Sequence, residues 1–262
     1  MIVCFLACVK AGRAYCPQDI SIPMSRVNET IESVEPELIF AVEGELEAFG
    51  RPLVGMEKIR EIARSFPESD NGNRQVTGGD NYYIIFTSGS TGKPKGVQIT
   101  LDCLNHYLEW SVELGGGSGE KRGAHFLNQA PFSFDLSVMD LYTCLACGGT
   151  LYTMEKELQS DYNAMYSFME RADIQVWVST PSFADVCLSD RKFNRELLPN
   201  LKTFLFCGEV LTTATAQRLT ERFPGAKIIN TYGPTESTVA VTEVEITKEL
   251  LERTVREGKS LD

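Results

Sequence analysis

The sequence predicts an α/β fold with a largely parallel sheet, and three observations lead to this prediction. Short runs of β-branched or aromatic residues alternate along the chain with helical patterns, as in a series of βαβ units. The pairs Gly148-Gly149 and Pro224-Gly225 end two of the helical segments. The chain has 262 residues, 43% of them apolar, and is long enough to bury a substantial core without covalent cross-links.

The predicted elements follow one another in this alternating order. Strands are expected at residues 38–42, 82–87, 126–129, 150–154, 175–179, 203–206, 227–230 and 239–246. Helices are expected at residues 101–113, 136–146, 164–172, 182–188 and 214–222. Because open parallel sheets bind ligands beyond the carboxyl ends of their strands, the loops that directly follow strands are the expected functional segments.

Two further segments have a distinctive composition. Residues 2–9 form an apolar run that a signal peptide or a buried helix would explain. No basic residue precedes the run, and it is shorter than the ~20 residues that span a bilayer. A buried helix that ends at Gly12 is therefore favoured. Residues 67–81 are polar and rich in Gly and Asn, which predicts a flexible surface loop.

Charge and cysteine content narrow the functional classes. With 25 basic and 36 acidic residues, the net charge is −11, which argues against nucleic acid or an anionic membrane as the main partner. Eight cysteines are too few for a disulfide scaffold. Cys144 and Cys147 form a CxxC pair, but His106 and His125 lie far from it in sequence, which disfavours a zinc site. We expect buried reduced thiols in a cytoplasmic protein without membrane insertion.

The first loop that carries chemistry follows the apolar run at 82–86. It reads Thr87-Ser88-Gly89-Ser90-Thr91-Gly92-Lys93-Pro94-Lys95-Gly96. Glycines allow close approach of the backbone to a ligand, while hydroxyls and lysines supply donors and positive charge, as in a polyphosphate cradle. Pro94 follows Lys93 where a Walker P-loop has Ser or Thr, so this is a different phosphate loop. A flexible linker is the alternative, but a linker needs neither the preceding strand nor the lysines.

The second such loop follows the apolar pair Ile228-Ile229. It reads Asn230-Thr231-Tyr232-Gly233-Pro234-Thr235-Glu236-Ser237-Thr238. Tyr232 could stack on a base, Thr235 could contact a phosphate, and Glu236 could bind a hard cation through oxygen. Taken alone, the segment is also consistent with a turn that caps the next element. The two loops together favour a nucleotide site.

These two motifs resemble the signatures of the adenylate-forming enzymes, which include acyl-CoA synthetases, peptide-synthetase adenylation domains and luciferases. Two further segments, Asn128-Gln129-Ala130-Pro131-Phe132-Ser133-Phe134-Asp135-Leu136-Ser137-Val138-Met139-Asp140-Leu141-Tyr142 and Phe204-Leu205-Phe206-Cys207-Gly208-Glu209-Val210-Leu211, are most similar to the D-alanine–D-alanyl carrier protein ligases of this superfamily. The resemblance extends along essentially the whole chain. It implies the large N-terminal domain of the adenylate-forming fold, with layered sheets flanked by helices.

The resemblance also implies an activity. Such an enzyme uses ATP and Mg²⁺ to convert D-alanine to D-alanyl-adenylate. It then transfers the acyl group to the phosphopantetheine thiol of a D-alanyl carrier protein, for D-alanylation of teichoic acids. Implied ATP contacts are Thr87, Ser88, Gly89, Ser90, Thr91, Gly92, Lys95, Gly208, Glu209, Asn230, Thr231, Tyr232, Gly233, Pro234 and Thr235. Implied substrate contacts are Asp135, Cys207 and Val239, and the implied magnesium ligand is Glu236.

Several alternatives stay open at this point. Asp135 matches the position that meets a substrate ammonium, but it could instead cap the following helix. Cys207 could narrow the pocket around a small side chain or be a small buried apolar residue. Compared with the family, the chain lacks a stretch before Met1 and the mobile C-terminal lobe after Asp262, so residues 1–262 are expected to form a partial N-terminal domain. The family's catalytic lysine belongs to that lobe, and no residue is assigned its role. Activation of another amino acid or carboxylic acid, or nucleotide binding without turnover, are the competing functions.

Overall fold

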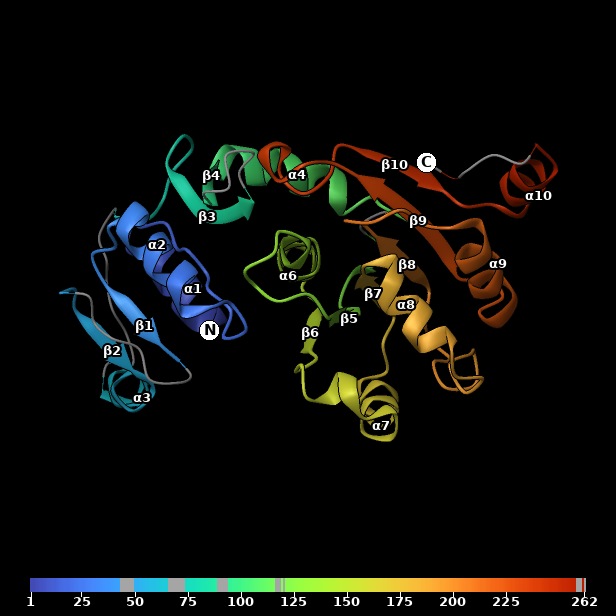
Figure 1. Cartoon of the computed structure of the whole chain (residues 1–262), viewed down its shortest axis with the longest axis horizontal. Coiled ribbons are helices and arrows are strands. Elements are labelled where there is room, and N and C mark those ends of the chain that lie inside the picture. Colours follow the sequence, from blue (N-terminus) through green and yellow to red (C-terminus); the bar gives the residue numbers. More distant parts are fainter. Residues whose placement is uncertain are drawn as a thin grey trace. The chain divides into compact units, whose positions relative to one another are not determined.

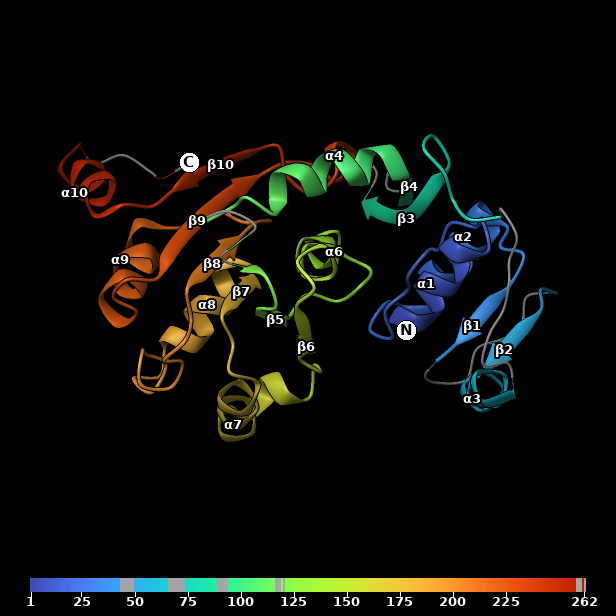
Figure 2. The same cartoon turned by 180° about the vertical axis from the view of Figure 1, so that it is seen from behind.

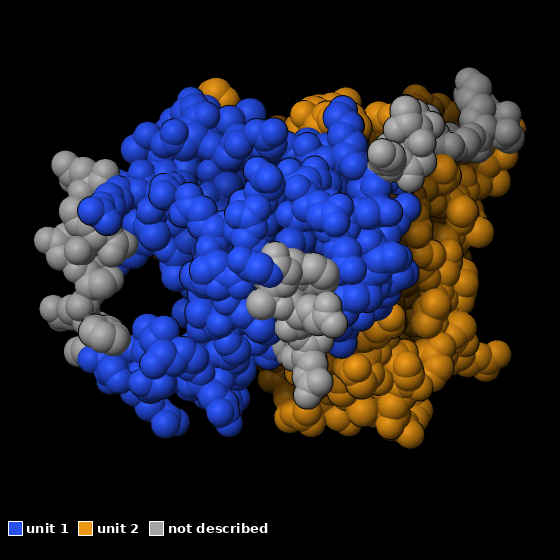
Figure 3. Space-filling view, turned by 60° about the vertical axis from the view of Figure 1, so that its left-hand side comes forward, with its two compact units in different colours: residues 1–104 blue, residues 105–262 orange. Residues whose placement is uncertain are grey.

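The computed structural model describes residues 1–42, 50–65, 74–88, 94–115, 119, 121–257 and 261. They belong to two compact units, Met1–Leu104 and Asn105–Asp262, which Figure 3 distinguishes by colour. Helix α4 (Leu101–Ser111) spans the boundary between the two.

Before α4, the described part of unit 1 contains two small pairs of strands and the helices α1, α2 and α3 (Figure 1). In chain order its elements are α1 (Ile2–Lys10), α2 (Met24–Val34), β1 (Ile39–Ala41), β2 (Leu53–Gly55), α3 (Met56–Ser65), β3 (Asn81–Ser88) and β4 (Pro94–Thr100). Strands β1 and β2 pair in parallel, whereas β3 and β4 form an antiparallel hairpin. The predictions at 38–42 and 82–87 correspond to β1 and β3, but α2, α3, β2 and β4 were not predicted.

The expected helix at the start of the chain is present as α1, but only Cys4 and Phe5 are buried on it. Phe5 is buried on it and stacks on Tyr15, with ring centroids 4.2 Å apart. The helix is followed by Gly12, whose φ of 73° favours glycine. A Cβ at Gly12 would lie 1.9 Å from the carbonyl oxygen of Arg74, so glycine is required for close packing as well. Of the loop predicted at 67–81, residues 74–80 contain no helix or strand, Asn81 begins β3, and 67–73 lie outside the described residues.

Unit 2 is built on a six-stranded sheet in the order β10-β9-β8-β7-β5-β6. Its strands are β5 (His125–Asn128), β6 (Thr150–Thr153), β7 (Val176–Ser179), β8 (Thr203–Phe206), β9 (Lys227–Tyr232) and β10 (Thr242–Glu245). The first five are parallel, and β10 is antiparallel to β9. The predicted α/β fold with a largely parallel sheet is therefore confirmed.

Helices cover both faces of this sheet. They are α6 (Leu136–Ala146), α7 (Tyr162–Ala172), α8 (Pro181–Leu188), α9 (Thr213–Arg222) and α10 (Lys248–Glu257), with short 3₁₀ turns at Leu158–Ser160 and Thr235–Ser237. Figures 1 and 2 show α7, α8 and α9 on one face and α6 on the opposite face. The predicted helices at 136–146, 164–172, 182–188 and 214–222 are confirmed within two residues, while α10 was not predicted.

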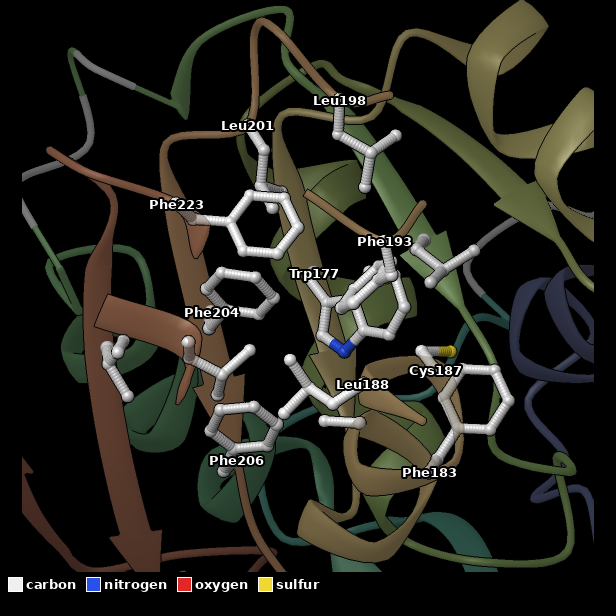
Figure 4. Close-up of a cluster of buried hydrophobic side chains, with 14 of the residues drawn as sticks. Trp177, Phe183, Cys187, Leu188, Phe193, Leu198, Leu201, Phe204, Phe206 and Phe223 are labelled. Atoms are coloured by element: carbon white, nitrogen blue, oxygen red, sulfur yellow. The ribbon is translucent and has the colours of Figure 1, made fainter. Parts of the chain in front are cut away.

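Aromatic side chains form the core between the sheet and helix α8. Trp177 of β7 is fully buried, and its ring centroid lies 5.1 Å from that of Phe193 and 5.8 Å from that of Phe204 (Figure 4). The indole nitrogen donates to the Ser179 hydroxyl at 2.7 Å, which satisfies its one donor. Burying aromatic rings of this size makes a major contribution to the free energy of folding and holds the strand ends in place.

One predicted strand begins in the wrong place. Residues 239–246 were expected to form a single strand, but Thr238 and Val239 have φ angles of 65° and 70°. Extended backbone requires negative φ, so the strand starts only at Thr242. All eight cysteines are free thiols, but the expected burial holds for only five of them, since Cys8 and Cys16 are half-buried and Cys103 is exposed. Among the described helices, none has the length and apolar character needed to cross a bilayer.

Candidate active site

Three strand ends of unit 2 carry the predicted substrate and nucleotide residues. The loop after β5 ends at Asp135, Cys207 directly follows β8, and Thr231 lies near the end of β9. Because these strands are parallel and belong to one sheet, their carboxyl ends lie on the same side of the sheet, where the strands finish. We call Asp135, Cys207, Thr231, Thr235 and Val239 the strand-end site.

Asp135 occupies the N-cap position of α6, but its side chain makes no capping hydrogen bond. Its carboxylate accepts hydrogen bonds from the Thr235 hydroxyl, which joins the loop after β5 to the motif after β9, and from the backbone nitrogens of Leu136 and of Asp135 itself. Burial raises the pKa of Asp135 above its ordinary value of 3.8, and the neighbouring carboxylate of Glu236 adds to the increase. No lysine or arginine of the described chain is among the groups that shift this pKa. Such a carboxylate would be stabilised by a cation brought by a ligand.

Cys207 connects the strand ends to the segment after the second motif. Its thiol is 4% exposed and lies 3.7 Å from the carbonyl oxygen of Val239, to which it donates. The Thr231 hydroxyl, which donates to the Phe206 carbonyl at 2.8 Å, interacts with the same thiol. Burial raises the pKa of Cys207, and the charge of Asp135 raises it further, so the thiol stays protonated at neutral pH. Cys207 is therefore suited to shaping a pocket and not to nucleophilic attack.

Val239 combines complete burial with an unfavourable backbone conformation. It is 1% exposed, and its φ of 70° is uncommon for a β-branched residue. Thr238 before it has a φ of 65°. Two consecutive residues of this kind cost on the order of 1–3 kcal/mol each, and such strain concentrates at ligand sites. The strained segment places the Val239 carbonyl against the Cys207 thiol.

Gly208 and Glu209 form the exposed continuation of the β8 end. Gly208 has a φ of 89°, which lets the chain turn away from the sheet directly after Cys207. The Glu209 carboxylate accepts a 3.0 Å hydrogen bond from the backbone nitrogen of Ser182, in the first turn of α8. Negative charge is favourable at a helix N-terminus, so this bond fixes the turn.

Two polar atoms beside the strand-end site lack protein partners. The Asn230 side-chain oxygen and the Ser133 hydroxyl are buried without a hydrogen bond among the described residues. Ser133 lies two residues before Asp135, and Asn230 lies in β9 directly before Thr231. A buried polar atom without a partner is costly, and a ligand would satisfy it. Sequence reasoning missed Ser133, because an isolated serine in a loop carries no local signal of its burial.

The rest of the second motif forms an exposed turn. Tyr232 ends β9 with 72% of its surface exposed, and Pro234 and Glu236 are also exposed. Gly233 packs against the backbone, since a Cβ there would lie 2.5 Å from the Cα of Ala240. The described residues contain no cluster of three or more acidic, histidine or cysteine side chains suited to a metal. The carboxylate of Glu236 fits Mg²⁺, which takes one or two protein carboxylates and completes its shell with phosphates and water.

The first motif belongs to the β3–β4 hairpin of unit 1. Thr87 and Ser88 end β3, and Lys95 is exposed in β4 opposite Thr87. Gly96 follows it and packs under the Phe86 ring, since a Cβ there would lie 3.0 Å from that ring. The predicted contacts Gly89, Ser90, Thr91 and Gly92 lie outside the described residues.

Comparison with known proteins identifies the family of this chain. Residues 1–260 match the family described as AMP-binding enzyme, and the chain belongs to that family. It is 48% identical over 254 residues to the D-alanine–D-alanyl carrier protein ligase of Bacillus anthracis (strain CDC 684 / NRRL 3495), and 48% identical over 255 residues to that of Bacillus cereus (strain Q1). Each alignment covers 97% of this chain and 50% of the relative. The chain thus spans about half the length of these curated relatives.

Solved structures confirm the fold of an adenylation N-terminal domain. The N-terminal subdomain of Klebsiella oxytoca NpsA, in complex with 3-hydroxybenzoyl-AMSN, matches 94% of this chain with a TM-score of 0.78 and 20% identity, over 59% of its own length. The Vibrio cholerae adenylation domain AlmE, in complex with glycyl-adenosine-5′-phosphate, matches 93% of this chain with a TM-score of 0.75 and 22% identity, over 50% of its own length. At these identities the likeness concerns the fold.

Proposed function

We propose that this chain is the nucleotide- and substrate-binding part of a ligase that activates D-alanine with ATP. The product is D-alanyl-adenylate, and the acyl group then passes, in the cytoplasm, to the phosphopantetheine thiol of a D-alanyl carrier protein that serves D-alanylation of teichoic acids. The single observation that carries the proposal is the Asp135 carboxylate at the strand-end site. It is half-buried beside a second carboxylate, and it takes its side-chain hydrogen bond from a hydroxyl of the nucleotide motif.

In this proposal three residues of the strand-end site, Asp135, Cys207 and Val239, bind the amino acid. Asp135 pairs with the ammonium group, because a buried ammonium requires a partner of opposite charge. Cys207 and Val239 form the wall beside the methyl group. Their burial and the strained backbone at Val239 keep this wall rigid, as selection of a small side chain requires.

The nucleotide is bound by the two motifs. Asn230 offers an unpaired acceptor to the adenine, and Tyr232 offers an exposed ring face. The backbone turn at Gly208 and Glu209, with Thr231, Gly233, Pro234 and Thr235, lines the adenine and the α-phosphate. The β- and γ-phosphates are bound by Thr87, Ser88, Gly89, Ser90, Thr91, Gly92 and Lys95. Bound Mg²⁺ offsets phosphate charge, and Glu236 would hold it. The work of this chain is positioning and charge stabilisation.

The test is amino-acid-dependent exchange of labelled pyrophosphate into ATP, with the full-length Bacillus cereus relative as the positive control. We expect exchange with D-alanine to exceed exchange with L-alanine and glycine. Faster exchange with another amino acid, or with a carboxylic acid that lacks an amino group, would instead support the alternative substrate classes.

A binding measurement on the same chain distinguishes an active enzyme from a chain that binds the nucleotide without turnover. Tight binding of 5′-O-[N-(D-alanyl)sulfamoyl]adenosine without exchange would mean nucleotide binding without turnover. Failure to bind either this analogue or ATP would contradict the proposed function altogether.

A further inference from the structure

A second aspartate of unit 2, Asp140, is completely buried and has no place in the activity proposed above. It lies in the middle of α6 with 0% of its surface exposed. Burying a carboxyl group is costly unless hydrogen bonds compensate it, and burial raises the pKa of Asp140 well above its ordinary value. Because burying this carboxyl group costs free energy, we asked which neighbouring groups its hydrogen bonds keep in position.

Asp140 holds the start of the loop that carries Asp135. The side-chain nitrogen of Asn128 donates to both Asp140 carboxyl oxygens, at 3.0 and 3.1 Å. The same nitrogen donates to the carbonyl oxygen of Ala130 at 3.0 Å. Asn128 is the last residue of β5, so its amide fixes the direction in which the chain leaves the sheet.

The far end of the same loop is held by the same helix. The hydroxyl of Ser137 donates to the carbonyl oxygen of Phe134 at 2.7 Å. Between the two anchors, the Phe134 nitrogen donates to the Pro131 carbonyl at 2.9 Å and closes a turn. The segment from Asn128 to Asp135 is therefore bound at both ends to one buried helix.

We propose that Asp140 is a positioning residue, which orients the Asn128 amide so that the β5–α6 loop presents the Asp135 carboxylate to the substrate ammonium. This inference rests on the proposed function, since it needs Asp135 to bind an amino group. It assigns no contact with the ligand to Asp140 itself.

The measurement compares two adenylate analogues that differ in one amino group. One is 5′-O-[N-(D-alanyl)sulfamoyl]adenosine, and the other is its propionyl counterpart, which lacks the ammonium. The ratio of their dissociation constants, from calorimetry at pH 7, reports only the recognition of the amino group. A residue with a merely structural role would weaken both analogues alike and leave the ratio unchanged.

Asp140→Ala is expected to reduce the preference for the amino analogue on the order of tenfold, as expected for a lost hydrogen-bonded anchor. Asn128→Ala removes the same bond from the strand and should reproduce the loss, which keeps the test valid if Asp140→Ala fails to fold. Asp140→Asn retains an acceptor oxygen for the Asn128 amide and should keep the preference within about threefold. Far-ultraviolet circular dichroism and thermal unfolding verify that each variant is folded.

Thr143→Val is the matched control. Thr143 is completely buried one turn further along α6, and its hydroxyl lies 2.9 Å from that of Ser111. Its loss should lower the midpoint of thermal unfolding without changing the ratio. If folded Asp140→Ala and Asn128→Ala both keep the parent ratio, or if Thr143→Val changes it equally, the positioning role is wrong.

Asp135→Asn separates this inference from the proposed function. If that variant keeps the amino-group preference, Asp135 does not bind the ammonium and the proposed function fails at that point. If Asp135→Asn removes the preference while the Asp140 and Asn128 variants keep it, only the positioning role fails.

Discussion

The strand-end site of unit 2 and the β3–β4 hairpin of unit 1 differ in how exposed their candidate functional side chains are. At the strand ends, Cys207 and Val239 are nearly inaccessible, and every side-chain hydroxyl or thiol of the site has a defined partner. On the hairpin, Ser88 and Lys95 are exposed on a two-stranded ribbon. In the proposed function, the preorganised strand-end site would select a small substrate, whereas the exposed donors of the hairpin would bind the highly charged phosphates.

The largest effect that tests this comparison is expected for Asp135→Asn. Removing one member of a buried charge pair typically costs ~3–5 kcal/mol, so affinity for the D-alanyl sulfamoyl analogue should fall a few hundredfold. Affinity for AMP should change less than about threefold, because AMP carries no ammonium. Calorimetric titration of both ligands provides the measurement. Equal losses for both ligands would show that Asp135 supports the whole site and not its selective part.

The pH dependence of the same affinity sharpens that result. Because burial raises the pKa of Asp135 above 3.8, protonation competes with ammonium binding at a higher pH than for an exposed aspartate. Below the raised pKa, affinity for the D-alanyl analogue should fall about tenfold per pH unit.

The raised pKa also affects stability. Because ionised Asp135 disfavours the folded state, Asp135→Asn should raise the free energy of unfolding near pH 7, and this gain should vanish below pH 3.8. A pH-independent affinity of the parent chain would contradict this assignment.

The next largest effect is expected for Cys207→Gly. Removing the thiol opens the wall beside the substrate methyl group, and discrimination by a small apolar group is worth ~1–3 kcal/mol. The preference for the D-alanyl over the L-alanyl sulfamoyl analogue should therefore fall about ten- to two-hundredfold. Cys187→Ala, at a completely buried thiol of α8, should leave the ratio unchanged. An unchanged ratio in Cys207→Gly would assign chirality to other residues.

A smaller effect is expected on the hairpin, for Lys95→Ala. The loss of one charged donor to phosphate should reduce ATP affinity by about tenfold and leave AMP affinity unchanged, because an exposed donor contributes near the lower end of charged hydrogen bonds. The same variant should not affect the amino-group preference of the sulfamoyl analogues. A reduced AMP affinity would contradict the proposal that the hairpin binds only the β- and γ-phosphates.

The last comparison concerns stability, not affinity, at two glycines that differ in what surrounds them. A Cβ at Gly233 would lie 2.5 Å from the Cα of Ala240, so the backbone must move. A Cβ at Gly96 would lie 3.0 Å from the Phe86 ring, which is able to shift. Gly233→Ala should cost ~1–3 kcal/mol and lower the unfolding midpoint by about 2–10 °C, whereas Gly96→Ala should cost about half as much or less. Differential scanning calorimetry provides the measurement, with Gly79→Ala as a control because nothing surrounds that position within 4 Å. The reverse order would mean that the hairpin is the more rigid region.

The elements of the sheet could be predicted where local signals agree with the tertiary structure. Helix α6 was predicted at its observed bounds, because Asp135 precedes it and a glycine pair follows it. Strand β4 was missed, since Pro94-Lys95-Gly96 is typical of a loop and becomes a strand only by pairing with β3. The start of β10 was misplaced because positive φ at Thr238 and Val239 is imposed by tertiary contacts and has no local signal in β-branched residues.

The residues of the candidate site could be predicted from the sequence, but the contacts among them could not. The motifs identified Asp135, Cys207 and the Asn230 segment, because their residue types match the family signatures. The bond from Thr235 to Asp135, the unpaired Ser133 hydroxyl and the Asn128–Asp140 pair depend on which side chains meet after folding. Sequence spacing does not encode such contacts between distant segments.

Strand β10 has a consequence for self-association of the chain. It forms one edge of the six-stranded sheet, and all four of its residues are exposed. An open edge is a template on which a second copy could add its own strand. Glu243 and Glu245 place two negative charges on this edge, so that two copies brought edge to edge repel each other. The edge thereby resists intermolecular β-pairing while its backbone hydrogen-bonding groups stay accessible to water.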